Sequence, residues 1–142
     1  MNLEFARCCL SISPGLYAQL NKVLENESID VEANHITVNF RDSSYSALAG
    51  GYHPVEIAFQ KDGENGTWSL LYITDFCYYG SPYAELVKEV DFDFSAGTLY
   101  LLNSPSMFIR RSTVKSFYRT WESNFLTYVD IGAFNEIEVS LY

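Results

Sequence analysis

Residues 68–94 read WSLLYITDFCYYGSPYAELVKEVDFDF, and this stretch decides the fold class of the chain. It is the densest run of aromatic and β-branched residues, which are the residue types that favour strands. From 67 to 79 both faces of the alternating pattern are apolar, so we expect a central strand covered on both sides. From 85 to 94 acidic and apolar residues alternate, which is typical of a half-exposed strand. The motif GSP at 80–82 separates the two strands.

Outside this stretch, periodicity predicts a helix near each end of the chain and further strands between them. Apolar residues recur at helical spacing over 14–26 and about 110–129, and Ser13-Pro14 is typical of a helix start. Alternation with period two, interrupted by loops at 41–53 and 61–66, predicts the remaining strands at 35–40, 54–59, 98–102 and 136–142. Short loops between consecutive strands indicate antiparallel pairing. We therefore predict an α+β fold, with a single twisted antiparallel sheet of about six to seven strands flanked by N- and C-terminal helices.

The size and charge of the chain limit its function. A chain of 142 residues with 48% hydrophobic residues is long enough for one domain, 1–142, with its own core. Eighteen acidic and nine basic residues give a net charge of −9, which argues against direct binding to nucleic acid or to a membrane surface. The same charge suits a basic protein partner.

The cysteines and the start of the chain indicate a cytoplasmic protein. The chain has an odd number of cysteines, and their spacing does not match a metal site: Cys8, Cys9 and Cys77. We therefore expect reduced thiols. The first residues have no basic segment followed by a long apolar one, and no apolar run is long enough to span a bilayer.

Asp75 is a carboxylate within an otherwise apolar strand, and such a group must be hydrogen-bonded, paired or raised in pKa. Two interpretations are open. Asp75 is either a structural carboxylate that accepts backbone N–H groups, or a binding carboxylate in a pocket with Tyr72, Tyr79 and His53 near it.

Glu89, Asp91 and Asp93 form an acidic row along one strand. This row is either a solvated sheet face or a docking surface for a basic partner. His35 and His53 are the only histidines, and no spacing pairs them with other ligands in a known motif. Because no nucleophile signature is present either, the sequence predicts no catalytic residue, no metal and no cofactor.

Three segments carry a family resemblance: YHPVEIAF at 52–59, LLYITDFCYYGSPYAELVKEVDFDF at 70–94 and FYRTWESNFLTYVDIGAFNEIEVSLY at 117–142. With them the chain resembles a small bacterial family of unknown function, found in Vibrio-like marine gamma-proteobacteria and often on mobile genomic islands. The resemblance implies a fold similar to that of the acidic mitochondrial-matrix proteins that bind a complement component. Those proteins are acidic, oligomeric and non-enzymatic, and they bind many partners.

Three functions are consistent with the sequence. The first is a non-enzymatic protein-interaction module that is acidic, self-associates as a homo-oligomer and binds a protein partner. The second is a small-molecule binding protein or an enzyme with a pocket around Asp75. The third is an acidic mimic of nucleic acid that acts on a basic partner.

Overall fold

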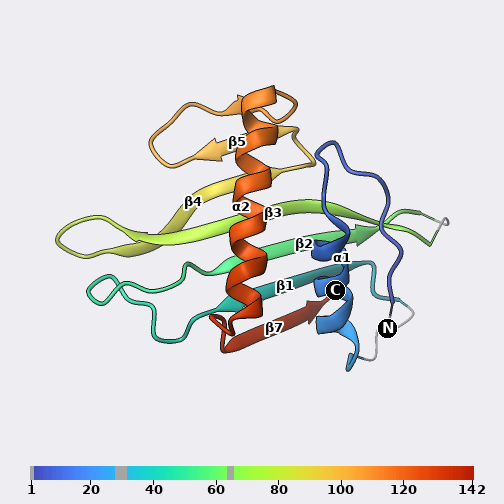
Figure 1. Cartoon of the computed structure of the whole chain (residues 1–142), viewed down its shortest axis with the longest axis horizontal. Coiled ribbons are helices and arrows are strands. Elements are labelled where there is room, and N and C mark those ends of the chain that lie inside the picture. Colours follow the sequence, from blue (N-terminus) through green and yellow to red (C-terminus); the bar gives the residue numbers. More distant parts are fainter. Residues whose placement is uncertain (1, 28–31, 64–65) are drawn as a thin grey trace.

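The computed structural model describes residues 2–27, 32–63 and 66–142, and they form two helices and one antiparallel sheet (Figure 1). The helices are α1 (Pro14–Leu24) and α2 (Ser112–Asp130). The strands are β1 (His35–Arg41), β2 (Val55–Lys61), β3 (Trp68–Tyr79), β4 (Glu85–Asp93), β5 (Thr98–Leu101), β6 (Met107–Phe108) and β7 (Glu136–Leu141). The predicted α+β fold is therefore confirmed.

The predicted elements are present, and none of their ends shifts by more than two residues. The N-cap at Ser13 is confirmed, because its side-chain oxygen accepts a hydrogen bond from the Leu16 amide at 3.2 Å. The two-residue strand β6 was not predicted, since so short a segment carries no periodicity. The hairpin loop predicted at 61–66 lies partly outside the described residues.

The sheet order is β6-β5-β4-β3-β2-β1-β7, and every pairing is antiparallel. The prediction that β3 is central is confirmed, because it is the fourth of the seven strands. The last strand, β7, returns across the sheet after α2 and pairs with β1, where Val38 lies opposite Val139. The C-terminal segment thus joins the sheet at the edge opposite to β6 (Figure 1).

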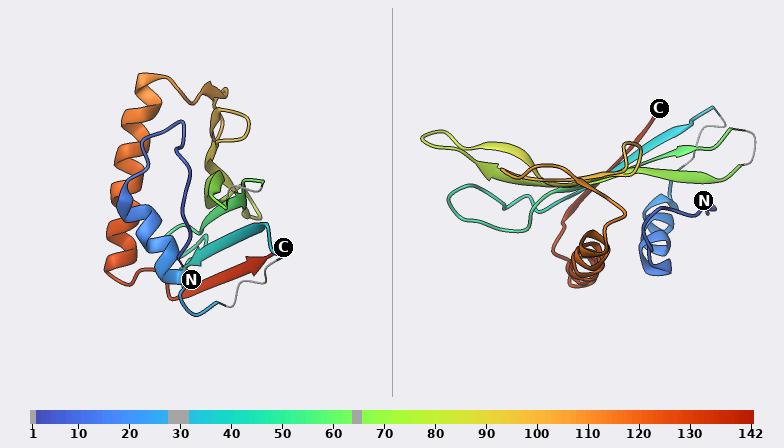
Figure 2. Two further views of the ribbon diagram at one scale, coloured as in Figure 1. Left: turned by 90° about the vertical axis from the view of Figure 1, so that its right-hand side faces the viewer. Right: turned by 90° about the horizontal axis from the view of Figure 1, so that it is seen from above.

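Both helices lie on the same face of the sheet, and that face carries the core (Figure 2). A row of side chains in register across five strands is fully or nearly fully buried there: Val38, Ile57, Ile73, Phe92 and Leu99. Phe125 of α2 packs edge-on against Phe40 of β1, with ring centroids 5.1 Å apart. These contacts hold α2 across the middle of the sheet.

The expectation that β3 is covered on both sides is wrong. Among the described residues no element lies on the face away from the helices (Figure 2). Thr74 on that face is nevertheless 1% exposed, because side chains of the neighbouring strands surround it. The sequence pattern was apolar on both faces because aromatic residues also occupy the uncovered face. Two of them, Tyr72 and Phe76, are only half-buried there.

Two irregularities bend the centre of the sheet. The β2–β3 register shifts between Ala58 and Phe59, and the β3–β4 register shifts between Asp75 and Phe76. Opposite the second shift Val90 pairs with Asp75 and Lys88 pairs with Phe76, so Glu89 is the extra residue of a β-bulge. A bulge re-aims the side chain that it carries, and this one decides where Glu89 points.

Candidate functional site

Asp75 lies on the helix face in the middle of β3, where α2 crosses the sheet. Its side chain is 17% exposed. The indole Nε1–H of Trp121, from α2, donates to Asp75 Oδ2 at 3.1 Å. The other oxygen, Oδ1, lies 3.0 Å from His53 Nδ1. The partners of this carboxylate are therefore side chains from two other segments of the chain.

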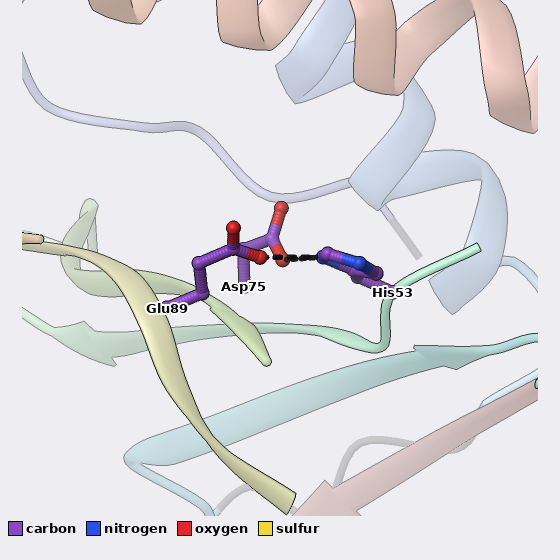
Figure 3. Close-up of side chains that lie close together, drawn as sticks. All are labelled: His53, Asp75 and Glu89. Atoms are coloured by element: carbon purple, nitrogen blue, oxygen red, sulfur yellow. Dashed lines mark hydrogen bonds and ion pairs between the residues drawn. The ribbon is translucent and has the colours of Figure 1, made fainter. Parts of the chain in front are cut away.

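His53 brings a second carboxylate into contact with the same nitrogen. It lies two residues before β2, and its Nδ1 is 2.7 Å from Glu89 Oε2 as well as 3.0 Å from Asp75 Oδ1 (Figure 3). The bulge in β4 places Glu89 on this face. In a regular strand Glu89 would point to the face away from the helices, with Asp91 and Asp93, while Val90 lies with Phe92 on the helix face in either case. His53, Asp75 and Glu89 form one cluster, which we call the triad.

A pocket of about 320 Å³ adjoins the triad. It is bounded by the segment before β2, by β2 and β3, and by the inner face of α2. Its lining is mostly aromatic and contains His53 and Asp75 as charged groups: Gly51, Tyr52, His53, Val55, Asp75, Trp121, Asn124, Phe125, Tyr128 and Phe134. An apolar cavity with few convergent polar groups is the usual form of a small-ligand site.

The electrostatics of the triad favour positive charge on the imidazole. The hydrogen bond that His53 donates to Asp75 raises the pKa of His53 above its ordinary value, partial burial opposes this, and the charges of Asp75 and Glu89 add to the increase. Within the described residues no lysine or arginine makes an ion pair with Asp75 or Glu89. Burial also raises the pKa of the neighbouring Cys77 thiol, so this residue stays protonated at neutral pH.

The face away from the helices carries a polar row that runs across six strands. In register this row is Glu138, Asn39, Glu56, Thr74, Asp91 and Tyr100. The Thr74 hydroxyl donates to Asp91 Oδ1 at 2.8 Å, and the Tyr72 hydroxyl donates to Glu56 Oε2 at 2.6 Å. We call this the open face. Its strand residues carry the carboxylates of Glu56, Asp91, Asp93, Glu136 and Glu138 beside the cations of Arg41 and Lys88.

The predicted site residues therefore divide between two faces of the sheet. Asp75, His53 and Glu89 meet in the triad. Tyr72 does not lie near Asp75. The two residues are three positions apart on β3, and side chains alternate between the faces of a strand, so Tyr72 points to the open face and Asp75 to the helix face. Tyr79 is also apart from them, half-exposed at the end of β3, where its hydroxyl accepts a hydrogen bond from Asn103 at 3.1 Å.

The predicted acidic row on one strand face is wrong. Glu89 turns to the helix face, while Asp91 and Asp93 remain on the open face. Asp91 is 9% exposed rather than solvated, and Lys88 Nζ lies 3.6 Å from its Oδ2. A mimic of nucleic acid needs carboxylates at regular intervals along one face, as phosphates are spaced in a duplex, and the carboxylates of β4 do not lie on one face.

The three cysteines are free, and Cys77 is buried, as expected for thiols within the fold. His35 is remote from the triad, and its ring lies 5.3 Å from the ring of Tyr142. No helix among the described residues has both the length and the apolar character needed to cross a bilayer.

Two functional contacts on α2 were missed from the sequence. Trp121 falls among the apolar residues that recur at helical spacing over about 110–129, and only the structure shows its N–H directed at Asp75. Glu122 is 7% exposed and accepts from the Tyr118 hydroxyl at 2.6 Å and from the Ser13 amide at 3.2 Å. A glutamate beside the apolar stripe of a predicted helix is a weak signal for such a buried acceptor.

The fold and the two faces define a class: α+β proteins with one antiparallel sheet, helices on one face and an acidic, uncovered opposite face. The chain belongs to the family described as "Protein of unknown function (DUF2787)", whose model matches residues 14–140. The resemblance inferred from the three sequence segments is thereby confirmed. Among curated proteins, none matches the chain.

Two solved structures are similar to this chain over nearly its whole length. The hypothetical protein VC0508 from the VSP-II pathogenicity island of Vibrio cholerae is 40% identical with a TM-score of 0.87, over 96% of this chain and 98% of its own. The conserved hypothetical protein VC1805 from the VPI-2 island of Vibrio cholerae O1 biovar eltor str. N16961 is 37% identical with a TM-score of 0.84, over 96% and 99%. VC1805 is described as sharing structural homology with the human P32 protein.

Proposed function

We propose that this protein is a non-enzymatic interaction module that binds a positively charged segment of a partner protein through its open face. The observation that carries the proposal is the six-strand polar row, in which carboxylates recur on a sheet face that neither helix of the described residues covers. An interface that presents one sign of charge selects a partner of the opposite sign and speeds its association.

The composition of the open face supports binding of a polypeptide rather than simple solvation. Tyr72, Phe76 and Tyr100 lie among the carboxylates and are half-buried, so they offer apolar contact area, and the two tyrosines add hydroxyl groups. Tyrosine is enriched in protein interfaces because it combines both. Lysine and arginine side chains match this surface, since their stems pack on aromatic rings while their charges meet carboxylates.

The likeness of VC1805 to human P32 supports the same class of function. The matrix proteins that the sequence resembles act by binding partners and not by catalysis, and they assemble into oligomers. We propose self-association for this chain also. Two open faces of like charge repel one another, so a homo-oligomeric contact would use another surface.

The test uses a lysine-rich peptide as probe and two variants with equal net charge. The first, Glu56→Gln/Asp93→Asn/Glu138→Gln, removes three carboxylate charges from the open face but keeps acceptor atoms in place for the Tyr72 hydroxyl and the Ala96 amide. The second, Glu4→Gln/Glu25→Gln/Asp130→Asn, removes three exposed charges elsewhere. Each variant has a net charge of −6, which is −9 plus three.

We expect the open-face variant to bind the peptide at least about tenfold more weakly at low salt, because several charge pairs are lost together. The control variant should bind as the wild-type protein does. Equal weakening in both variants would mean that net charge alone attracts the peptide, and the proposal would then fail. The affinity is measured by isothermal titration calorimetry over a series of salt concentrations, since binding at a charged surface weakens as salt screens it.

A second candidate function is favoured by the pocket beside the triad. Its volume and aromatic lining suit a small ligand, and Asp75 and His53 would provide polar contacts to it. This candidate uses the opposite face of the sheet, so both functions are compatible in one molecule. Soaking or titration with a fragment library, followed by substitution Asp75→Asn, distinguishes it from peptide binding on the open face.

A further inference from the structure

Three potential ligand atoms from distant parts of the chain converge on one point. His53 Nδ1, Asp75 Oδ1 and Glu89 Oε2 come from the segment before β2, from β3 and from the bulge of β4 (Figure 3). The ligand atoms of this triad all lie within 4.8 Å of one another. We propose that the triad binds one divalent transition-metal ion, which would be a site independent of the open face.

The charge balance of the triad is the first argument. Two carboxylates approach a single imidazole nitrogen, at 3.0 and 2.7 Å, and that nitrogen carries at most one proton. A protonated His53 would leave one negative charge of the pair without a counter-charge, because no lysine or arginine in the described residues pairs with Asp75 or Glu89. A divalent cation bound by a neutral imidazole and two carboxylates gives a neutral cluster.

The distances fit an ion with small adjustments. At metal–nitrogen and metal–oxygen bonds of about 2.0–2.2 Å, neighbouring ligand atoms of one ion lie roughly 2.8–3.6 Å apart, with the smaller separations at octahedral and the larger at tetrahedral angles. The two separations from Nδ1, 3.0 and 2.7 Å, lie near the lower end of this range. The Glu89 side chain is 40% exposed at a bulge, so it can move outward by the few tenths of an ångström required.

The surroundings hold the ligands as the outer shell of a metal site does. Trp121 Nε1–H donates to Asp75 Oδ2 at 3.1 Å, which leaves Oδ1 directed at His53. In metal sites, hydrogen bonds from residues that do not touch the ion fix the orientation of the ligating carboxylates. The ring of Tyr45 lies 5.3 Å from that of His53 and packs beside it. The adjoining pocket leaves room for water or another ligand on the ion.

The donor set indicates the class of ion. An imidazole nitrogen suits zinc, cobalt, iron and copper, whereas magnesium and calcium prefer sites made of oxygen only. Two carboxylates together with one imidazole therefore favour a borderline divalent ion such as Zn²⁺ or Co²⁺. The sequence could not reveal this site, since the ligands are separated by 22 and 14 residues, from 53 to 75 and from 75 to 89, and form no local motif.

The test uses Co²⁺ alone as the probe, added to the full chain after dialysis against a chelator and removal of that chelator. We expect saturation at one equivalent by calorimetry and by visible absorption. The substitutions His53→Asn and Glu89→Gln should each weaken binding by more than about tenfold, and Trp121→Phe by about tenfold, since outer partners have effects of that size. Mg²⁺ should not compete at equal concentration.

Two controls separate the triad from other donors. His35→Asn removes the other histidine, and Cys8→Ser/Cys9→Ser removes the adjacent thiols. Both should bind Co²⁺ as the wild-type chain does, and circular dichroism of every variant shows that it is folded. Failure of the wild-type chain to bind Co²⁺, or binding that persists in His53→Asn and Glu89→Gln, overturns the proposal. Binding lost only with the cysteines overturns it equally.

Discussion

Asp75 has both of its carboxylate oxygens engaged by side chains of other segments, so its cost of burial is offset by contacts that also fix α2 against the sheet. Trp121 contributes twice. Its N–H donates to Asp75, and its ring stacks on that of Phe125 with centroids 5.2 Å apart. A single residue therefore connects the hydrogen bonding of the triad with the packing of the helix.

Replacing Trp121 with Phe tests the hydrogen bond and largely preserves the stacking. We expect the free energy of unfolding to fall by about 1–3 kcal/mol, because a carboxylate that is largely buried loses a donor. Urea denaturation provides the measurement, and Trp68→Phe is the matched control. Trp68 is buried, whereas Trp121 is half-buried, and the Trp68 indole makes no hydrogen bond within the described part of the chain. A loss no larger than that of the control would argue against the role of the N–H.

Cys8 gives a pH-dependent prediction. Burial, opposed in part by the Leu10 backbone hydrogen bond, raises the pKa of this thiol from 9.0 to about 11. A raised pKa means that the fold favours the protonated form. The stabilisation is complete below the unfolded pKa and is lost as the pH rises through the folded value. Relative to Cys8→Ser, the wild-type chain should therefore lose stability between pH 9 and pH 11.

That difference is measured by urea denaturation at several pH values on both proteins, since comparison with Cys8→Ser removes the contributions of the tyrosines. The two proteins should show a constant difference below pH 8. Alkylation of Cys8 by iodoacetamide at pH 8 should also be slow in the folded chain and should accelerate in urea, because only the thiolate reacts. Equal alkylation rates in the folded and unfolded chains would be inconsistent with a raised pKa.

At the scale of elements, periodicity predicted the helices and six of the strands, because apolar residues recur along each of them at the helical or strand period. It misassigned the faces within β3 and β4. Glu89, Asp91 and Asp93 alternate in sequence, but the bulge places Glu89 on the helix face. A bulge has no fixed sequence pattern, and for this reason the triad could be predicted only as far as the pairing of Asp75 with His53.

The packing of α2 on the sheet is the main contact between layers, and Phe125 lies at its centre. Its ring is 2% exposed and contacts the rings of Phe40, Trp121 and Phe134. Phe125→Ala should lower the free energy of unfolding by about 3–5 kcal/mol through lost burial and the cavity left behind. The exposed Phe108→Ala, at 72% exposure, should change it by less than about 0.5 kcal/mol. Similar effects of the two substitutions would contradict the described core.

At the scale of the whole molecule, both helices lie on one side of the sheet (Figure 2). The core lies on that side, and the carboxylates of the open face lie on the other. Net charge and composition predicted an acidic binding protein, but they could not assign the charge to one face. That assignment depends on register, and a shift of one residue in β1, β2 or β7 would have moved Asn39, Glu56 and Glu138 to the helix side.

Self-association belongs to the same scale. Because like charges on two open faces repel, a homo-oligomer would assemble through a different surface. The molar mass measured by light scattering should therefore be the same for the wild-type chain and for Glu56→Gln/Asp93→Asn/Glu138→Gln. A larger assembly formed only after these carboxylates are neutralised would show that the open face is itself a self-association surface held apart by charge. The assignment of this face to a basic partner would then be wrong.

The claim that a basic partner binds the open face is tested most directly by mapping the residues that a basic peptide contacts. In a titration of the ¹⁵N-labelled chain with the lysine-rich peptide, backbone amide shifts should concentrate on the open face at Asn39, Glu56, Thr74 and Asp91. The indole N–H of Trp121, on the opposite side of the sheet, should stay unchanged. Shifts at Trp121 and the pocket residues, or shifts spread evenly over every acidic segment, would contradict the account.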